Sequence, residues 1–128
     1  MGTRLMKLVL VIDDDPVIRA VVRQVLERDG FSVEAADNAQ SGLIRFAELN
    51  PDLVIIDIMM PGKEGMETIL EMREANPDAC ILAMTGGGGN STAGNVLHMA
   101  ELLGADNTLK KPFAPAALLD TVKRCLKP

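Results

Sequence analysis

The sequence contains no tryptophan and no tyrosine, and only three of its 128 residues are phenylalanine. A folded core must therefore consist mainly of aliphatic side chains, and these are plentiful because 48% of the residues are apolar. A chain of this length can bury about two-thirds of the surface that it exposes when unfolded. We expect one domain that covers residues 1–128.

Positive charge is also scarce, with 13 basic against 18 acidic residues and a net charge of −5. A nucleic-acid-binding surface needs a basic footprint, so the sequence argues against direct nucleic-acid binding. Apolar runs such as Leu8–Ile12 are far shorter than the roughly 20 residues of a membrane span. No secretory signal is visible near the N-terminus. We expect no membrane association and a cytoplasmic location.

Cysteine is limited to two positions, Cys80 and Cys125, which both lie inside apolar segments. This placement is typical of buried thiols in a reducing compartment. It does not indicate a disulfide or a metal site.

Short apolar runs alternate with segments of helical periodicity five times along the chain. Asp15-Pro16 and Asn38 supply caps for the first two helices. This (βα)5 order predicts a doubly wound, flavodoxin-like α/β fold with a parallel sheet of strand order 2-1-3-4-5. The expected strands are Lys7–Ile12, Ser32–Ala36, Leu53–Ile56, Cys80–Met84 and Asn107–Lys110.

Polar side chains follow four of these strands. Asp13 and Asp14 follow the first, Asp57 the third, Thr85 the fourth and Lys111 the fifth. The carboxyl ends of parallel strands meet at the edge where α/β folds bind ligands. Crowded carboxylates repel one another, and Mg²⁺, which prefers oxygen ligands, relieves that repulsion. Together with a hydroxyl and an ammonium group they suit phosphoryl transfer to a carboxylate.

The segments VIDDDP, VIIDIMMPGKEG, LAMTGG and LKKPF resemble the four signatures of the CheY-like receiver domain of two-component response regulators. The resemblance covers essentially the whole chain in the expected order. It implies that a sensor histidine kinase or a histidine phosphotransfer protein donates a phosphoryl group to one aspartate, with Mg²⁺. The domain catalyses only its own phosphorylation and dephosphorylation. The face formed by the fourth helix, fifth strand and fifth helix then acts on an output protein or effector domain.

The resemblance also assigns roles at the acidic end of the site. It makes Asp57 the phosphoacceptor and Asp13 and Asp14 the acidic pair. Asp14 is expected to touch Mg²⁺ directly, and Asp13 mainly through water. The backbone carbonyl of Met59 matches the third protein ligand.

Thr85 and Lys111 match the remaining family positions. Thr85 corresponds to the switch residue whose hydroxyl moves with the phosphoryl group. Lys111 corresponds to the lysine that pairs with the phosphoryl group. The Lys111–Pro112 bond resembles the family's cis peptide.

The sequence departs from the family pattern in the region that would carry the switch. Thr108 stands where the family often has tyrosine or phenylalanine, so an aromatic switch is impossible there. The segment from Thr85 to Lys111 is longer than usual, and the excess falls in Gly86–Gly94. Because glycine permits large backbone changes, we expect a variable loop and a displaced fourth helix.

Hydrolysis of the phosphorylated aspartate is expected to be slow. Met59 places an apolar side chain beside the site, and Gly87 has no side chain that could position an attacking water.

Two other functions remain open at this point. Asp13, Asp15 and Val17 spell DxDxV, which resembles the nucleophile motif of haloacid-dehalogenase-like phosphatases, with Asp13 as the nucleophile. That family's further acidic motif has no counterpart after Lys111, and the reading leaves Asp57 unexplained. The other alternative is a pseudo-receiver that binds partners without being phosphorylated.

Overall fold

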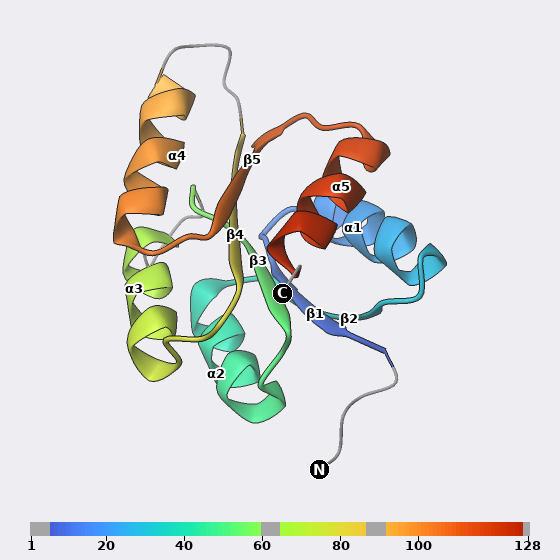
Figure 1. Cartoon of the computed structure of the whole chain (residues 1–128), viewed down its shortest axis with the longest axis horizontal. Helices are drawn as coiled ribbons and strands as arrows, with labels where there is room; N and C mark the ends of the chain where they lie inside the picture. Colours follow the sequence, from blue (N-terminus) through green and yellow to red (C-terminus); the bar gives the residue numbers. More distant parts are fainter. Residues whose placement is uncertain (1–5, 60–64, 87–91, 127–128) are drawn as a thin grey trace.

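The computed structural model describes residues 6–59, 65–86 and 92–126. Strands and helices alternate throughout, as the sequence predicts (Figure 1). Their bounds are β1 Leu8–Ile12, α1 Pro16–Arg28, β2 Ser32–Ala36, α2 Ala39–Leu49, β3 Leu53–Asp57, α3 Gly65–Ala75, β4 Ile81–Gly86, α4 Thr92–Leu103, β5 Asn107–Lys111 and α5 Pro115–Cys125.

The five strands form one parallel sheet in the order β2-β1-β3-β4-β5, which confirms the predicted topology. Three strands extend further than the sequence predicts. Asp57 is the last residue of β3, Thr85 lies within β4 and Lys111 ends β5. All three are strand residues because they pair across the sheet. Asp57 pairs with Met84, Thr85 with Lys110, and Lys111 with Gly86.

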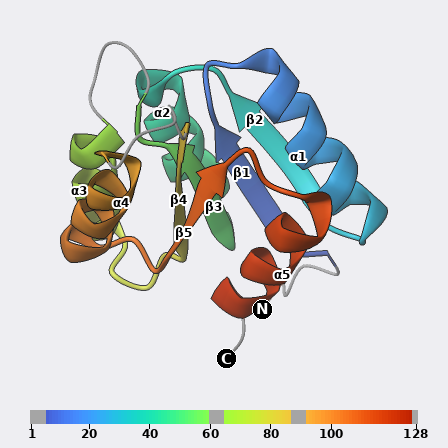
Figure 2. The same cartoon turned by 90° about the horizontal axis from the view of Figure 1, so that it is seen from above.

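Helices cover both faces of the sheet, with α1 and α5 on one face and α2, α3 and α4 on the other (Figures 1 and 2). Successive strand residues point to opposite faces, which divides the apolar core into two clusters. Leu10 and Ile56 belong to the cluster under α2, α3 and α4, whereas Val11 and Ile55 belong to the cluster under α1 and α5. All four side chains are fully buried. The interior strand β1 is apolar along its whole length because both of its faces are covered.

Local capping fixes the starts of the first two helices. The Asp15 carboxylate accepts a hydrogen bond from Val17 N at 2.9 Å, and Pro16 occupies the first turn of α1. The Asn38 side chain accepts one from Ser41 N at 2.8 Å at the start of α2. These caps are the ones that the sequence predicts, because they depend only on neighbouring residues.

The longest helix, α1, has 13 residues. At about 1.5 Å per residue its length is about 20 Å, less than the roughly 30 Å thickness of a bilayer's hydrocarbon core. Within residues 6–59, 65–86 and 92–126, no helix is long and apolar enough to cross a membrane.

The glycine-rich segment Gly86–Gly94 is described only at its two ends. Gly86 is the last residue of β4, and α4 begins at Thr92. The predicted variability of the loop concerns residues 87–91, which lie outside the described residues.

Arg73 joins three segments at the amino-terminal edge of β4 and β5. All five of its N–H groups are used: they donate to the carbonyl oxygens of Pro77, Ala79 and Gly104 and to the Asp106 carboxylate, over 2.5 to 3.2 Å. Asp106 in turn accepts a hydrogen bond from Ile81 N at 2.8 Å. The end of α3, the start of β4 and the turn before β5 are therefore held by one guanidinium.

We predict that Arg73→Lys lowers the free energy of unfolding by about 2–4 kcal/mol, because an ammonium group has three donors and cannot match the planar fork. The matched control is Arg23→Lys, which changes an exposed pair with Glu27 and is expected to alter stability by less than about 0.5 kcal/mol. Urea unfolding followed by circular dichroism measures both. Equal stability of the two variants would contradict the bridging role of Arg73.

Candidate phosphoryl-acceptor site

Asp13 lies directly after β1 and is fully buried. Its amide donates to Ala36 O at 3.1 Å, which continues the pairing of β1 with β2. Its carboxylate accepts hydrogen bonds from Asp15 N at 2.9 Å and from Lys111 Nζ at 2.8 Å. Both carboxylate oxygens are thus held in place before any ligand binds.

Asp57 occupies the last position of β3 and is also buried. Its Oδ1 atom accepts a hydrogen bond from Met59 N at 2.9 Å, and its Oδ2 atom accepts one from Lys111 Nζ at 3.1 Å. Met59 itself is 60% exposed, so an apolar side chain lies at the surface beside this carboxylate.

Lys111 joins the two buried carboxylates. It ends β5, and its bond to Pro112 is cis, as the sequence pattern predicts. Burial alone would lower the pKa of Lys111, but the hydrogen bond to Asp13 and the charges of Asp57 and Asp13 outweigh burial and raise that pKa above its usual value. The ammonium group therefore stays charged.

Burial raises the pKa of Asp13 above its ordinary value, and the nearby charge of Asp57 acts in the same direction. The hydrogen bonds from Lys111 and from Asp15 N oppose this rise without cancelling it. The two carboxylates at this buried edge therefore carry more negative charge than the single lysine can offset.

Asp14 completes the acidic cluster from an exposed position. Oxygen atoms of Asp13, Asp14 and Asp57 all lie within 4.8 Å of one another. Three carboxylates with oxygen donors and one side open to solvent form a set that suits a hard divalent cation.

Thr85 is buried within β4, next to Met84, which is the strand partner of Asp57. Its own partner across the sheet is Lys110, the neighbour of Lys111. The structure thus places the predicted hydroxyl on the strand that separates Asp57 from Lys111.

Arg19 is a contributor that the sequence reasoning missed. Its Nη1 atom donates to the backbone carbonyl of Asp13 at 2.8 Å. Arg19 also lines a concave surface of about 450 Å³ near the end of β2. Its position one turn into the helix that follows Asp13 was a signal that could have identified it.

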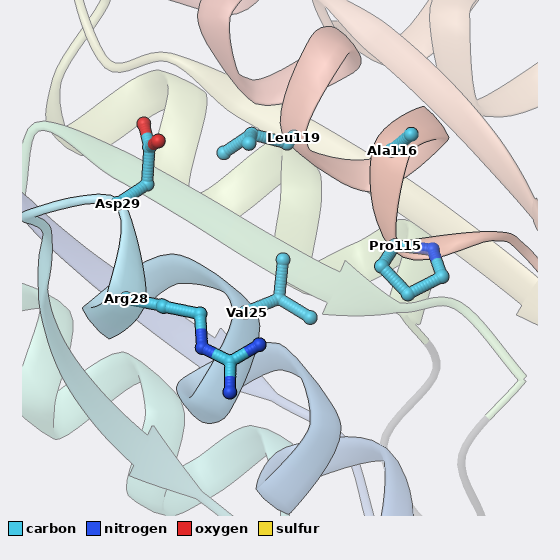
Figure 3. A pocket seen from close by; sticks show the side chains of 6 residues that line it. All are labelled: Val25, Arg28, Asp29, Pro115, Ala116 and Leu119. Carbon is cyan, nitrogen blue, oxygen red and sulfur yellow. The ribbon is translucent and has the colours of Figure 1, made fainter.

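A second hollow, of about 220 Å³, lies between α1 and the start of α5, and its lining includes no residue of the acidic cluster (Figure 3). Most of its lining is apolar. The residues are Val25, Arg28, Asp29, Pro115, Ala116 and Leu119.

Comparison with known protein families identifies the proteins that this chain resembles. The family model of the response regulator receiver domain matches residues 9–123. The C4-dicarboxylate transport transcriptional regulatory protein DctD of Pseudomonas aeruginosa is 37% identical over 119 residues. The transcriptional regulatory protein ResD of Bacillus subtilis is 32% identical over 119 residues. The match covers 93% of this chain in both cases, but 25% of DctD and 48% of ResD, so the chain spans half or less of these relatives.

Solved structures agree with this assignment. A receiver domain protein from Clostridium thermocellum superposes with a TM-score of 0.85 at 29% identity, covering 94% of both chains. The receiver domain of NtrX from Brucella abortus gives a TM-score of 0.85 at 28% identity, covering 92% of this chain and 97% of that one. Because the family model spans nearly all of the sequence, the chain belongs to the receiver domain family of two-component response regulators.

Proposed function

We propose that Asp57 accepts a phosphoryl group from a phosphohistidine, with Asp13, Asp14 and Lys111 arranged around it. The observation that carries this proposal is the contact of Lys111 Nζ with both buried carboxylates, at 2.8 Å to Asp13 and 3.1 Å to Asp57. An Asp57 oxygen attacks the phosphorus atom, and the phosphorus–nitrogen bond of the donor breaks. The lysine supplies a fixed positive charge where the phosphoryl oxygens arrive. The domain catalyses this step on itself.

Mg²⁺ is the proposed cofactor, held by Asp13, Asp14, Asp57 and the backbone carbonyl of Met59. The cluster of three carboxylates supports this assignment, since Mg²⁺ binds oxygen donors and keeps several waters. When bound, the ion neutralises the negative charge of the carboxylates and of the incoming phosphoryl group.

We assign the switch to Thr85 and Lys111. Thr85 and Lys110 are strand partners, as are Gly86 and Lys111, so a shift at the phosphoryl site passes directly between β4 and β5. Thr108 lies within β5 and is partly buried, and it provides no aromatic ring. The response at the face of α4, β5 and α5 therefore depends on backbone and hydroxyl movement.

The proposed partners are a sensor histidine kinase or a histidine phosphotransfer protein as donor, and an output protein or effector domain as receiver of the signal. Two of the relatives are described as transcriptional regulators, and this chain matches only a part of each. We place this activity in the cytoplasm, and the two free thiols at Cys80 and Cys125 are compatible with a reducing compartment.

The family match lends no support to the phosphatase alternative, in which Asp13 is the nucleophile. That alternative also gives no role to Asp57, which contacts the same lysine as Asp13. A phosphatase would also hydrolyse small phosphate esters with many turnovers, which the proposed function does not include.

Incubation with acetyl phosphate and Mg²⁺ is expected to add one phosphate to the parent chain and none to Asp57→Asn, because an amide oxygen is a poor nucleophile. Intact-mass spectrometry measures the addition. The matched control is Asp120→Asn, an exposed carboxylate on α5, which is expected to be labelled like the parent. Phosphate on Asp57→Asn, or sustained turnover of phosphate esters by the parent, would contradict the assignment.

Asp14→Asn is expected to weaken Mg²⁺ binding at least about tenfold, because a carboxylate ligand of the ion is replaced by a neutral amide. The matched control is Asp15→Asn, which removes the same charge from the neighbouring position while asparagine still caps α1. Calorimetric titration or amide chemical shifts report binding, since the chain has no tryptophan. Equal Mg²⁺ affinity in the two variants would remove Asp14 from the metal site.

Slow hydrolysis of the acyl phosphate is attributed to the exposed, apolar Met59 side chain. We expect Met59→Asn to shorten the lifetime of phosphorylated Asp57 severalfold, because an amide can orient a water molecule, whereas Met59→Leu leaves it unchanged. The decay of the phosphorylated mass after donor removal gives the lifetime. A parent lifetime of seconds with Mg²⁺ would contradict the expectation. Gly87, the other residue in this argument, lies outside the described residues.

A further inference from the structure

Two cysteines that are far apart in the sequence meet at the end of the sheet opposite the acidic cluster. Cys80 immediately precedes β4, and Cys125 is the last residue of α5. The Cys80 thiol donates a hydrogen bond to the backbone carbonyl of Cys125 at 2.9 Å, across 45 positions of sequence. The side chain of Cys80 therefore lies directly against the backbone of Cys125.

The surroundings of the two sulfurs are unequal. Asn107, the first residue of β5, donates from Nδ2 to Cys125 Sγ at 3.1 Å. The neighbouring Cys80 thiol lowers the pKa of Cys125, and the hydrogen bond from Asn107 adds to this effect against the opposing influence of burial. The nearby Cys125 thiol, together with burial, raises the pKa of Cys80. Cys125 is therefore the more readily ionised member of the pair.

Both cysteines are half-buried, which differs from the full burial that the sequence predicts. Neither residue is sealed in the core, and the hydrogen bond to Cys125 O holds the Cys80 sulfur beside Cys125. The contact between the two cysteines is the unusual feature of this site.

We propose that Cys80 and Cys125 are an oxidant-sensitive dithiol that closes to a disulfide between the start of β4 and the end of α5 when hydrogen peroxide is present. The Cys125 thiolate attacks one peroxide oxygen, the O–O bond breaks, and a sulfenic acid forms as hydroxide leaves. The Cys80 sulfur then attacks Cys125 Sγ, the S–S bond forms, and the S–O bond breaks. The protons of the two thiols convert the departing hydroxides to water. Overall, two thiols are oxidised and one peroxide is reduced to two waters.

The disulfide would close a loop that contains β4, α4, β5 and most of α5. A cross-link of this length stabilises the fold by restricting the unfolded chain. It would also fasten the last turn of α5 to the sheet. In a reducing compartment such a bond is transient, as is usual for redox-sensing cysteines. The site shares no residue with the proposed phosphoryl-acceptor site.

The test treats the reduced full chain with hydrogen peroxide, removes the excess with catalase, and analyses the product without reductant. The expected product is a monomer that has lost two hydrogens, resists alkylation, and yields a peptide in which Cys80 is joined to Cys125. Dithiothreitol restores both thiols, and the oxidised form melts about 5 °C or more above the reduced form. Oxygen addition without a cross-link, a disulfide-linked dimer, or two thiols that remain alkylatable would overturn the proposal.

Single variants assign the two roles. Cys80→Ala is expected to stop at a sulfenic acid on Cys125, which dimedone traps. Cys125 keeps its hydrogen bond from Asn107 in Cys80→Ala, so Cys80 in Cys125→Ala is expected to react more slowly than Cys125 does in Cys80→Ala. Equal rates in the two variants would overturn the assignment of Cys125 as the attacking sulfur. The peptide map of the parent chain decides the disulfide itself without depending on either variant.

Discussion

One ammonium group between two buried carboxylates is the interaction around which the acidic edge of this sheet is organised. Lys111 contacts Asp13 and Asp57 at 2.8 and 3.1 Å, and neither aspartate has appreciable access to water. Without Lys111, the two buried negative charges would repel each other with no positive charge to offset them. Since one positive charge does not balance two, the same edge favours a further cation. A need for charge balance thus connects the fold with the proposed chemistry.

This arrangement depends on strand order. Asp13, Asp57 and Lys111 belong to the ends of β1, β3 and β5, and β4 lies between the last two in the sheet. The long lysine side chain spans β4, the strand that carries Thr85. Asp57 is therefore connected to β4 through its pairing with Met84 and to β5 through Lys111. The five residues of β5 also connect the two ends of the sheet, since Lys111 contacts the carboxylates and Asn107 contacts Cys125.

Local sequence patterns predicted the elements well because their causes are local. Apolar runs marked β1, β3 and β4, and Asp15 and Asn38 marked two helix starts through bonds to residues two and three positions away. Strand ends were placed too early at Thr85 and Lys111, because pairing with a neighbouring strand sets where a strand ends. Arg73 carried no sequence signal at all, since its acceptors come from two separate segments, before β4 and before β5.

The sequence by itself determined the fold class and the set of acidic, hydroxyl and basic side chains that follow the strands. Both result from short-range order: the period of apolar residues, the caps, and the motif around each strand end. Only the tertiary structure decided which atoms meet. Lys111 reaches Asp13 across 98 positions, and Cys80 reaches Cys125 across 45. Such contacts depend on how the strands are ordered and how the helices pack against the sheet, and no pattern of neighbouring residues records that.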